Sequence, residues 1–546
     1  MTGSTTGGRL VVDCLEAQEV TTCFGVPGES YLEVLDALRD SSIRYVSCRQ
    51  EGGAAYAAEA WGKLTGEPGI CFVTRGPGAA NASIGVHAAR QASTPMILFV
   101  GQVGTGHRGR EAFQEIDYRS VFRDIAKWVV EIDDADRIPE TIARAFVTAC
   151  SGRPGPVLVA LPENMLTATT AASPAPRVRI SEPAPSPAAV DESLAILRGA
   201  ERPLVLVGGG GWSDAGSAAL IDFVERNDLP TASVFRFHDR LDNGSPSYVG
   251  DAGIGMLPHI RRAILDADVI LALGIRFGEI ATEAWSLLDV PVPAQTVIHA
   301  HPSDRELGKL YQVALPVHAG PNAMAAALSG QVLDHGRWAS WRAELRSSYE
   351  VSLVAPPQPG DLDMAEVMRV LQAAVPDDVI ITNGAGNFSI WPNKFFSFAA
   401  AARLLAPQSG SMGYGLPAAI AAKIAHPDRT VVCFAGDGDI QMNIQELGTA
   451  LQAGAQPIVL VLNNEMYGTI RMHQERQHPG RVSGTDIVNP DFVALAEAYG
   501  FHAERVSRTD QFAAAFDRAT SSPTGALLEL VVPRRMLTPT HELGSD

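Results

Sequence analysis

The fold class follows from two nearby segments of the chain. The first is Thr430-Val-Val-Cys-Phe-Ala-Gly-Asp-Gly-Asp439, and the second is Pro457-Ile-Val-Leu-Val-Leu-Asn-Asn-Glu465. Each is a short apolar run that ends in polar residues, and the intervening residues 440–455 have the length and composition of a helix. Because strand, helix and strand in succession are typical of a βαβ unit, we predict two neighbouring parallel strands. Their carboxyl ends would meet at one edge of a sheet, where ligands of such sheets bind.

The same alternation of apolar runs and helical stretches recurs along the chain. It includes residues 69–74 and 95–100 in the first third and residues 203–207 and 269–273 in the middle third. Continuous apolar strands are typical of parallel sheets that helices cover on both faces. We therefore predict an α/β protein built from doubly wound parallel sheets.

Two Pro-rich stretches divide the chain into three blocks. They lie at about 167–189 and at 355–360, and their composition is typical of extended linkers. Each remaining block has the size of an ordinary domain. We predict three doubly wound domains, at residues 1–170, 190–335 and 360–535.

Composition and charge exclude several classes of protein. The chain has 546 residues and a formal net charge of −18, so we expect no binding to nucleic acid or to an anionic membrane surface. We expect neither a signal peptide nor a membrane-spanning helix, because no apolar run is long enough. The six cysteines are scattered without a CxxC pair, which indicates reduced thiols in a cytoplasmic protein.

The two strand ends carry groups that suit a metal bound to phosphate. Asp437 and Asn464 would lie at the same edge of the sheet, and carboxylate and amide oxygens are ligands that Mg²⁺ accepts. Gly436 and Gly438 would let the backbone approach a phosphate closely. A plain turn is the alternative for the glycines, whereas a calcium loop is excluded because Met442 stands where its glycine belongs.

The spacing of these residues resembles a known cofactor motif. Gly436-Asp437-Gly438, 24 residues and Asn463-Asn464 are similar to the thiamine diphosphate (ThDP) motif. Further segments resemble the acetolactate (acetohydroxyacid) synthases and related decarboxylases: Ser411–Ala419, Phe24–Gly28, Glu51–Ala54, Thr74–Asn81 and Gly101–Val103. By this resemblance the chain is identified as a member of the ThDP-dependent enzymes. The three domains would then be a pyrimidine-binding domain, a central Rossmann-like domain and a diphosphate-binding domain.

The resemblance implies roles for individual residues around the cofactor. Mg²⁺ would be held by the side chains of Asp437 and Asn464 and by the carbonyl of Met466. Met412 would support a bent ThDP, with its reacting groups close together. Further cofactor contacts would come from Gly410, Gly436, Gly438, Asp439, Asn387 and Tyr467.

The resemblance also implies a catalytic acid and a shared active site. Glu51 would act on the pyrimidine ring, and burial would keep its carboxyl neutral. In the family, the residues equivalent to Glu51 and Asp437 of one site come from different chains. We therefore expect a homodimer or a homotetramer, with active sites between chains.

The residues expected around the substrate match the synthase pattern only in part. Phe113 and Gln114 would line the acceptor side, with Gln114 among the catalytic residues, and Thr469 and Ile470 would face the reacting carbon. Three positions depart from the synthase pattern: His473 replaces a tryptophan, Asn387-Phe388 replaces Gln-His, and Glu29, directly after the pocket residue Gly28, replaces a glycine. An acid at Glu29 could protonate the reacting carbon and release an aldehyde.

The central block resembles the family less closely. Gly274-Ile-Arg-Phe277 looks like part of an FAD-binding segment, but Gly278-Glu-Ile280 and Ile298-His-Ala-His301 lack the acidic residues that usually follow. These departures disfavour FAD, although they leave its binding possible. The glycines at 208–211 do not satisfy GxGxxG.

The implied reaction is decarboxylation of a small, pyruvate-like 2-oxo acid and ligation of the acyl unit to a second 2-oxo acid or an aldehyde. The alternative within the family is a non-oxidative decarboxylase that uses Glu29 and releases an aldehyde. From other classes, the chain could be a nucleotide-binding oxidoreductase that uses the glycines at 208–211, or a catalytically silent ThDP-binding paralogue.

Overall fold

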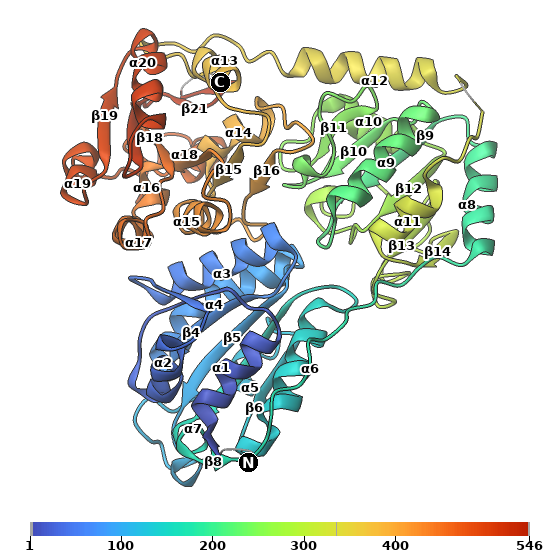
Figure 1. Ribbon diagram of the computed structural model, residues 1–546. Helices are drawn as coiled ribbons and strands as arrows, with labels where there is room; N and C mark the ends of the chain where they lie inside the picture. Colours follow the sequence, from blue (N-terminus) through green and yellow to red (C-terminus); the bar gives the residue numbers. More distant parts are fainter. Residues whose placement is uncertain (1–3, 335, 544–546) are drawn as a thin grey trace.

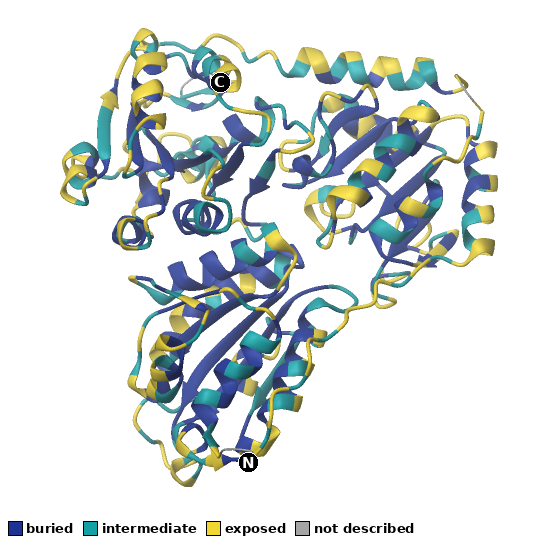
Figure 2. Cartoon of the chain, in the orientation of Figure 1, coloured by how far each residue is buried: buried dark blue, intermediate teal, exposed yellow. Residues whose placement is uncertain are grey.

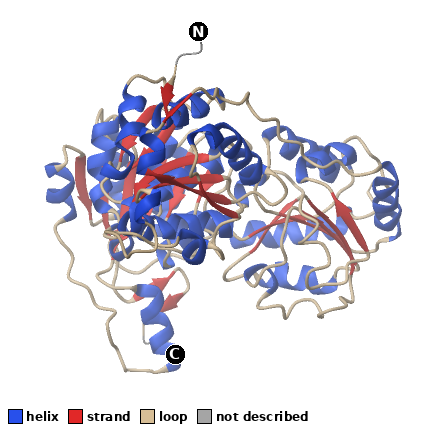
Figure 3. Ribbon diagram, turned by 90° about the horizontal axis from the view of Figure 1, so that it is seen from below, coloured by secondary structure: helices blue, strands red, loops and turns tan. Residues whose placement is uncertain are grey.

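A computed structural model describes residues 4–334 and 336–543. It contains three six-stranded parallel sheets, each with helices on both faces (Figure 1). The predicted α/β class and the three doubly wound sheets are therefore confirmed. Seen from below, the central sheet lies beside the other two (Figure 3).

The N-terminal sheet has the strand order β3-β2-β4-β5-β7-β6. Its strands are β2 (Thr22–Gly25), β3 (Arg44–Ser47), β4 (Gly69–Thr74), β5 (Met96–Gln102), β6 (Trp128–Glu131) and β7 (Pro156–Pro162). The main helices around it are α1 (Gly7–Ala17), α2 (Leu32–Arg39), α3 (Glu51–Thr65), α4 (Arg75–Ala92) and α6 (Ile138–Cys150). The central strands are buried on both sides, which is why their sequences are apolar throughout (Figure 2).

The central sheet has the order β11-β10-β9-β12-β13-β14. Its strands are β9 (Pro203–Val207), β10 (Thr231–Val234), β11 (Tyr248–Ala252), β12 (Val269–Leu273), β13 (Thr296–His301) and β14 (Leu315–His318). Its helices are α8 (Pro187–Gly199), α9 (Asp214–Arg226), α10 (Pro258–Asp266), α11 (Pro321–Leu328) and α12 (Ala339–Ser352). Residues 171–186, before α8, form neither helix nor strand.

The C-terminal sheet has the order β16-β15-β17-β18-β20-β19. Its strands are β15 (Ile380–Asn383), β16 (Arg403–Leu405), β17 (Val431–Gly436), β18 (Ile458–Asn463), β19 (His502–Val506) and β20 (Ala526–Val531), with β21 (Met536–Thr538) outside the sheet. The helices are α13 (Met364–Ala374), α14 (Ile390–Lys394), α15 (Gly415–Ala425), α16 (Asp437–Ile440), α17 (Leu447–Ala453), α18 (Gly468–Gln477), α19 (Phe492–Ala498) and α20 (Thr509–Thr520).

The prediction of one helix over residues 440–455 was wrong. Only Ile440 belongs to a helix before the segment turns: it ends α16, residues 441–443 form a turn, Ile444–Glu446 form a 3-10 turn, and α17 follows. Asn443 interrupts the helix with φ −141°, and its Nδ2 donates to the carbonyl of Gly413 at 2.9 Å. A side-chain contact with a distant loop therefore overrides the local helical pattern.

Two helices of small residues join the N-terminal and C-terminal domains. Alanines of α3 and of α15 belong to one buried cluster that spans both domains. The phenol of Tyr414 donates to the buried carboxylate of Glu59 at 2.5 Å across this contact. Among the described residues, no helix is long and apolar enough to cross a membrane.

Candidate active site

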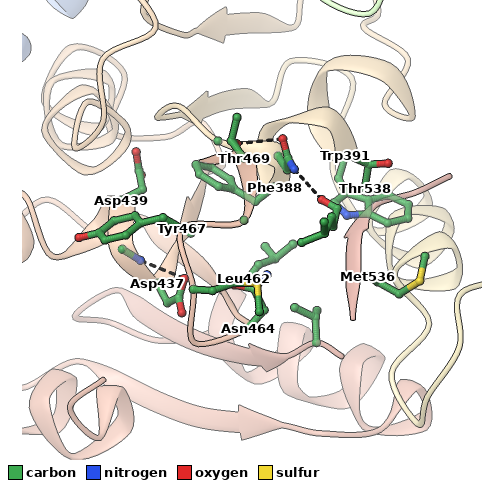
Figure 4. Close-up of a pocket in the computed structure, with 18 of the residues that line it drawn as sticks. Phe388, Trp391, Asp437, Asp439, Leu462, Asn464, Tyr467, Thr469, Met536 and Thr538 are labelled. Atoms are coloured by element: carbon green, nitrogen blue, oxygen red, sulfur yellow. Dashed lines mark hydrogen bonds between the residues drawn. The ribbon is translucent and has the colours of Figure 1, made fainter. Parts of the chain in front are cut away.

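A cavity of about 260 Å³ opens at the carboxyl edge of β17 and β18 (Figure 4). The two strands are parallel, and Gly436 pairs with Leu462. Asp437 directly follows Gly436, and Asn464 lies two residues after Leu462. Both therefore reach the cavity, as the strand pattern predicts.

Asp437 is a buried carboxylate without a cation beside it. It is only 2% exposed, its Oδ1 accepts from the Gly438 N–H at 3.0 Å, and its Oδ2 accepts from Asn489 Nδ2 at 2.8 Å. Burial raises the pKa of this carboxyl. Within residues 4–334 and 336–543, no Lys, Arg or His lies within 4.0 Å of it. A buried, partly satisfied carboxylate in a cavity fits a bound cation.

Asn464 and Met466 supply further oxygens at the same place. Both line the cavity. The carbonyl of Met466 accepts the Gly468 N–H at 3.0 Å and keeps a second lone pair. In the part of the chain that the structure describes, no three His, Cys, Asp or Glu side chains cluster as a metal site. The donor set of one carboxylate, one amide and one carbonyl fits Mg²⁺, which takes its other ligands from phosphate and water.

The two predicted phosphate-loop glycines are required by packing. A Cβ at Gly436 would lie 2.7 Å from the Phe388 ring, and one at Gly438 would lie 2.5 Å from the Tyr467 ring. The backbone therefore runs directly beneath two aromatic rings that line the cavity. Any larger residue would push these rings into the space for a ligand.

Gly410, Met412 and Asp439 also line the cavity, but Asp439 does more than face a ligand. Its Oδ1 accepts the N–H groups of Ala385 at 3.0 Å and of Gly413 at 2.9 Å. It thereby joins the loops that follow β15 and β16. Burial raises the pKa of Asp439 to about 7.

Asn387 connects two other walls of the cavity. Its Oδ1 accepts from the Thr469 hydroxyl at 2.9 Å, and its Nδ2 donates to the carbonyl of Leu537 at 2.8 Å. Ile470 lines the rim and is 54% exposed. His473, predicted as a pocket residue, is exposed and does not line this cavity.

Several cavity residues escaped the sequence analysis. Trp391, Met536 and Leu537 line the cavity, and Asn489 orients Asp437. They lie in segments without a motif, and Asn489 is also 25 residues beyond Asn464. Only the folded chain brings them to the strand ends.

The predicted site residues of the N-terminal domain do not line this cavity in the single chain. They are Gly28, Glu29, Glu51, Phe113 and Gln114. Glu51 begins α3, is half-buried, and accepts from Asn81 Nδ2 at 2.9 Å. Glu29 is exposed and lies 3.3 Å from Arg75. Phe113 is 74% exposed. One chain therefore carries two separate groups of predicted site residues.

The residues of the central domain do not favour a dinucleotide. A Cβ at Gly209 would lie 2.1 Å from the Gly274 carbonyl oxygen, and one at Gly210 would lie 2.2 Å from that of Ser93. These glycines thus permit close backbone packing. At the end of β13, His299 and His301 are buried histidines, where the resemblance would lead one to expect aspartates. Burial lowers the pKa of His301 to about 4.

Comparisons with known proteins agree with this geometry. Three family models match: the N-terminal TPP binding domain of thiamine pyrophosphate enzymes at residues 5–121, the central domain at 190–328 and the C-terminal TPP binding domain at 384–530. Thiamine pyrophosphate (TPP) is ThDP under another name.

Curated relatives cover nearly the whole chain. Acetolactate synthase isozyme 2 large subunit of Escherichia coli (strain K12) is 32% identical over 96% of this chain and 95% of its own. An acetolactate synthase large subunit of Parasynechococcus marenigrum is 32% identical over 97% and 88%. A probable one of Methanocaldococcus jannaschii is 30% identical over 96% and 92%. The chain therefore belongs to the thiamine pyrophosphate enzymes, in the family of the acetolactate synthase large subunits.

Proposed function

We propose that the protein is a ThDP- and Mg²⁺-dependent enzyme that decarboxylates a pyruvate-like 2-oxo acid and ligates the acyl unit to a second 2-oxo acid or an aldehyde. The observation that carries this proposal is the pair Asp437 and Asn464 at neighbouring strand ends, around a cavity that Met412 also lines. The relatives named above are acetolactate synthase large subunits, and the match with this chain covers most of the length of each.

The cavity residues take distinct roles in this proposal. Asp437, Asn464 and the Met466 carbonyl would hold Mg²⁺ and, through its charge, the diphosphate. Met412 and Gly410 would hold the ring system, and the residues around the cofactor would be Gly436, Gly438, Asp439, Asn387 and Tyr467. Bound ThDP supplies the electron sink that decarboxylation needs, while the apolar walls orient the substrate and exclude water.

The second group of predicted residues comes from a partner copy. Glu51 would be the acid that donates a proton to the pyrimidine ring of bound ThDP, and Phe113 and Gln114 would line the acceptor side. Their absence from the cavity of the single chain supports a shared site. So does the exposure of Phe113 and Ile470, which are 74% and 54% accessible. The proposed assembly is a homodimer or a homotetramer.

The alternatives have less support. Arg75 pairs with Glu29 and also with Glu163, so Glu29 is engaged in an ion-pair network. The glycines at 208–211 do not satisfy GxGxxG, and close backbone packing already accounts for Gly209 and Gly210, so these glycines do not by themselves indicate a dinucleotide site. FAD stays disfavoured because residues 278–280 and 298–301 lack the acidic residues that usually follow the FAD-binding segment. The proposed domain boundaries remain 1–170, 190–335 and 360–535, and the proposed compartment is the cytoplasm, where the six free cysteines stay reduced.

A product analysis tests the proposal. The full chain is incubated with pyruvate, ThDP and Mg²⁺, and acetolactate and acetaldehyde are quantified with and without EDTA. We expect acetolactate to be the main product and to require both cofactors. Acetaldehyde as the main product would favour the decarboxylase instead. Absence of both ThDP binding and CO₂ release would refute the function.

A further inference from the structure

A short segment after β16 is held in place by the other two domains. Lys63 of α3 donates from Nζ to the carbonyl of Ala406 at 2.7 Å. Arg236, just after β10, donates from Nη1 to the carbonyl of Pro407. Gln408 in turn donates from Nε2 to the carbonyl of Phe235 at 2.7 Å. This segment leads directly to Gly410 and Met412, so its position determines theirs.

Arg236 has a second contact, with the loop after β15. Its Nη2 donates to the carbonyl of Gly384 at 3.2 Å. One guanidinium from the central domain therefore joins the ends of two strands in the C-terminal domain. Because a guanidinium is planar and presents several N–H groups in fixed directions, it fixes the relative position of two carbonyls better than a single-point donor does.

The two loops that Arg236 joins both contribute to the cofactor cavity. Beyond Gly384, the first loop runs to Asn387 on the cavity wall. In the second loop, the carbonyl of Pro407 also accepts the Gly410 N–H at 3.0 Å and so closes the turn before Met412. The loops meet again at Asp439, as described above.

Stability alone does not explain this arginine. Arg236 is 4% exposed, and among the described residues no carboxylate lies within 4.0 Å of it. Its backbone has φ +60°, a conformation that costs energy for a residue other than glycine. Burial lowers its pKa to about 10, although the Asp439 carboxylate opposes this shift, so the side chain is charged at neutral pH. A buried charge without an ion-pair partner and a strained backbone both oppose folding.

We propose that Arg236 is a positioning residue of the ThDP site, which holds the loops after β15 and β16 so that Asn387 and Met412 face one cavity. The inference rests on the proposed function, because it concerns the same cavity. It assigns the central domain a part in shaping the cofactor site.

The test measures ThDP affinity rather than turnover. Full-length apoprotein is titrated with ThDP at saturating Mg²⁺, and binding is followed by tryptophan fluorescence, since Trp391 lines the cavity. Arg236→Met removes the donors and keeps an apolar stem. Arg346→Met is the matched control, because Arg346 Nη1 donates to the carbonyls of Asn243, Ser245 and Tyr248, all within the central domain.

We expect Arg236→Met to weaken ThDP binding by about tenfold or more, the loss of one to two charged hydrogen bonds. The ThDP affinity of Arg346→Met is expected to stay within about twofold of wild type, even if this variant lowers the thermal midpoint of the apoprotein as much as Arg236→Met does. Arg236→Lys, which can donate to only one carbonyl at a time, is expected to weaken binding by about threefold to tenfold.

The outcomes separate the two proposals. If wild type binds ThDP and Arg236→Met binds it equally well, the positioning role is refuted and the proposed function stands. If wild type does not bind ThDP, the proposed function fails. Should Arg236→Met not be recovered folded, Arg236→Lys decides, because unchanged affinity there overturns the need for both carbonyl contacts. Equal weakening in Arg346→Met would reduce the effect to general stability and overturn the inference.

Discussion

Replacing Asp437 by Asn removes one charge from the proposed metal site and almost no volume. The carboxylate is 2% exposed, and its two oxygens accept from Gly438 and Asn489. Breaking a buried pair of opposite charges costs about 3–5 kcal/mol. We therefore expect the Mg²⁺-dependent affinity for ThDP to fall by a factor of about 10² to 10⁴.

The same substitution is expected to have little effect on the stability of the apoprotein. Burial raises the pKa of Asp437, so without metal the ionised carboxylate opposes folding at neutral pH. An amide removes this penalty but weakens the contact with Asn489. The two effects have opposite signs and individually amount to about 1–3 kcal/mol, so we expect a net change within about 1 kcal/mol.

The assay combines ThDP titrations over a range of Mg²⁺ concentrations with thermal unfolding in EDTA. Glu446→Gln is the matched control: Glu446 is buried at 1% exposure and burial raises its pKa, but it accepts from the Arg49 N–H and lies outside the cavity. Wild-type Mg²⁺ dependence in Asp437→Asn would refute the metal assignment. A large loss of apoprotein stability would show that Asp437 has a structural role instead.

Three other substitutions give separate tests. Glu51→Gln should retain ThDP but slow exchange of its C2 proton with solvent by orders of magnitude, as measured by NMR after acid quench, and unchanged exchange would remove Glu51 from its role. Glu29→Ala should leave acetolactate formation largely intact, whereas a loss of acetaldehyde would support the decarboxylase alternative. His301 has its folded pKa lowered to about 4 from 6.5, so the unfolded chain takes up its proton first as pH falls between these values. The free energy of unfolding should therefore fall less in His301→Gln than in wild type, by up to about 3 kcal/mol, as the pH is lowered from about 6.5 to about 4. Urea unfolding at these two pH values measures the difference. An equal loss of stability in wild type and variant would contradict a neutral, buried His301.

The sequence by itself determined the α/β class and the placing of Asp437 and Asn464 at one edge. Both follow from local rules. Continuous apolar runs indicate parallel strands buried on both faces, and two consecutive strands of a βαβ unit end on the same side. The register of Gly436 with Leu462 realises this expectation.

The distant segments that complete the cavity depend on tertiary packing. Leu537 lines the cavity from β21, Asn489 orients Asp437 from a loop without a motif, and Arg236 reaches its loops from another domain. The helix predicted after Ile440 is also interrupted, at Asn443, whose side chain donates to the carbonyl of Gly413 in a distant loop. The physical reason is common to these cases: a hydrogen bond between groups that are far apart in the sequence leaves no periodic pattern in it, so the contact exists only once the chain has folded.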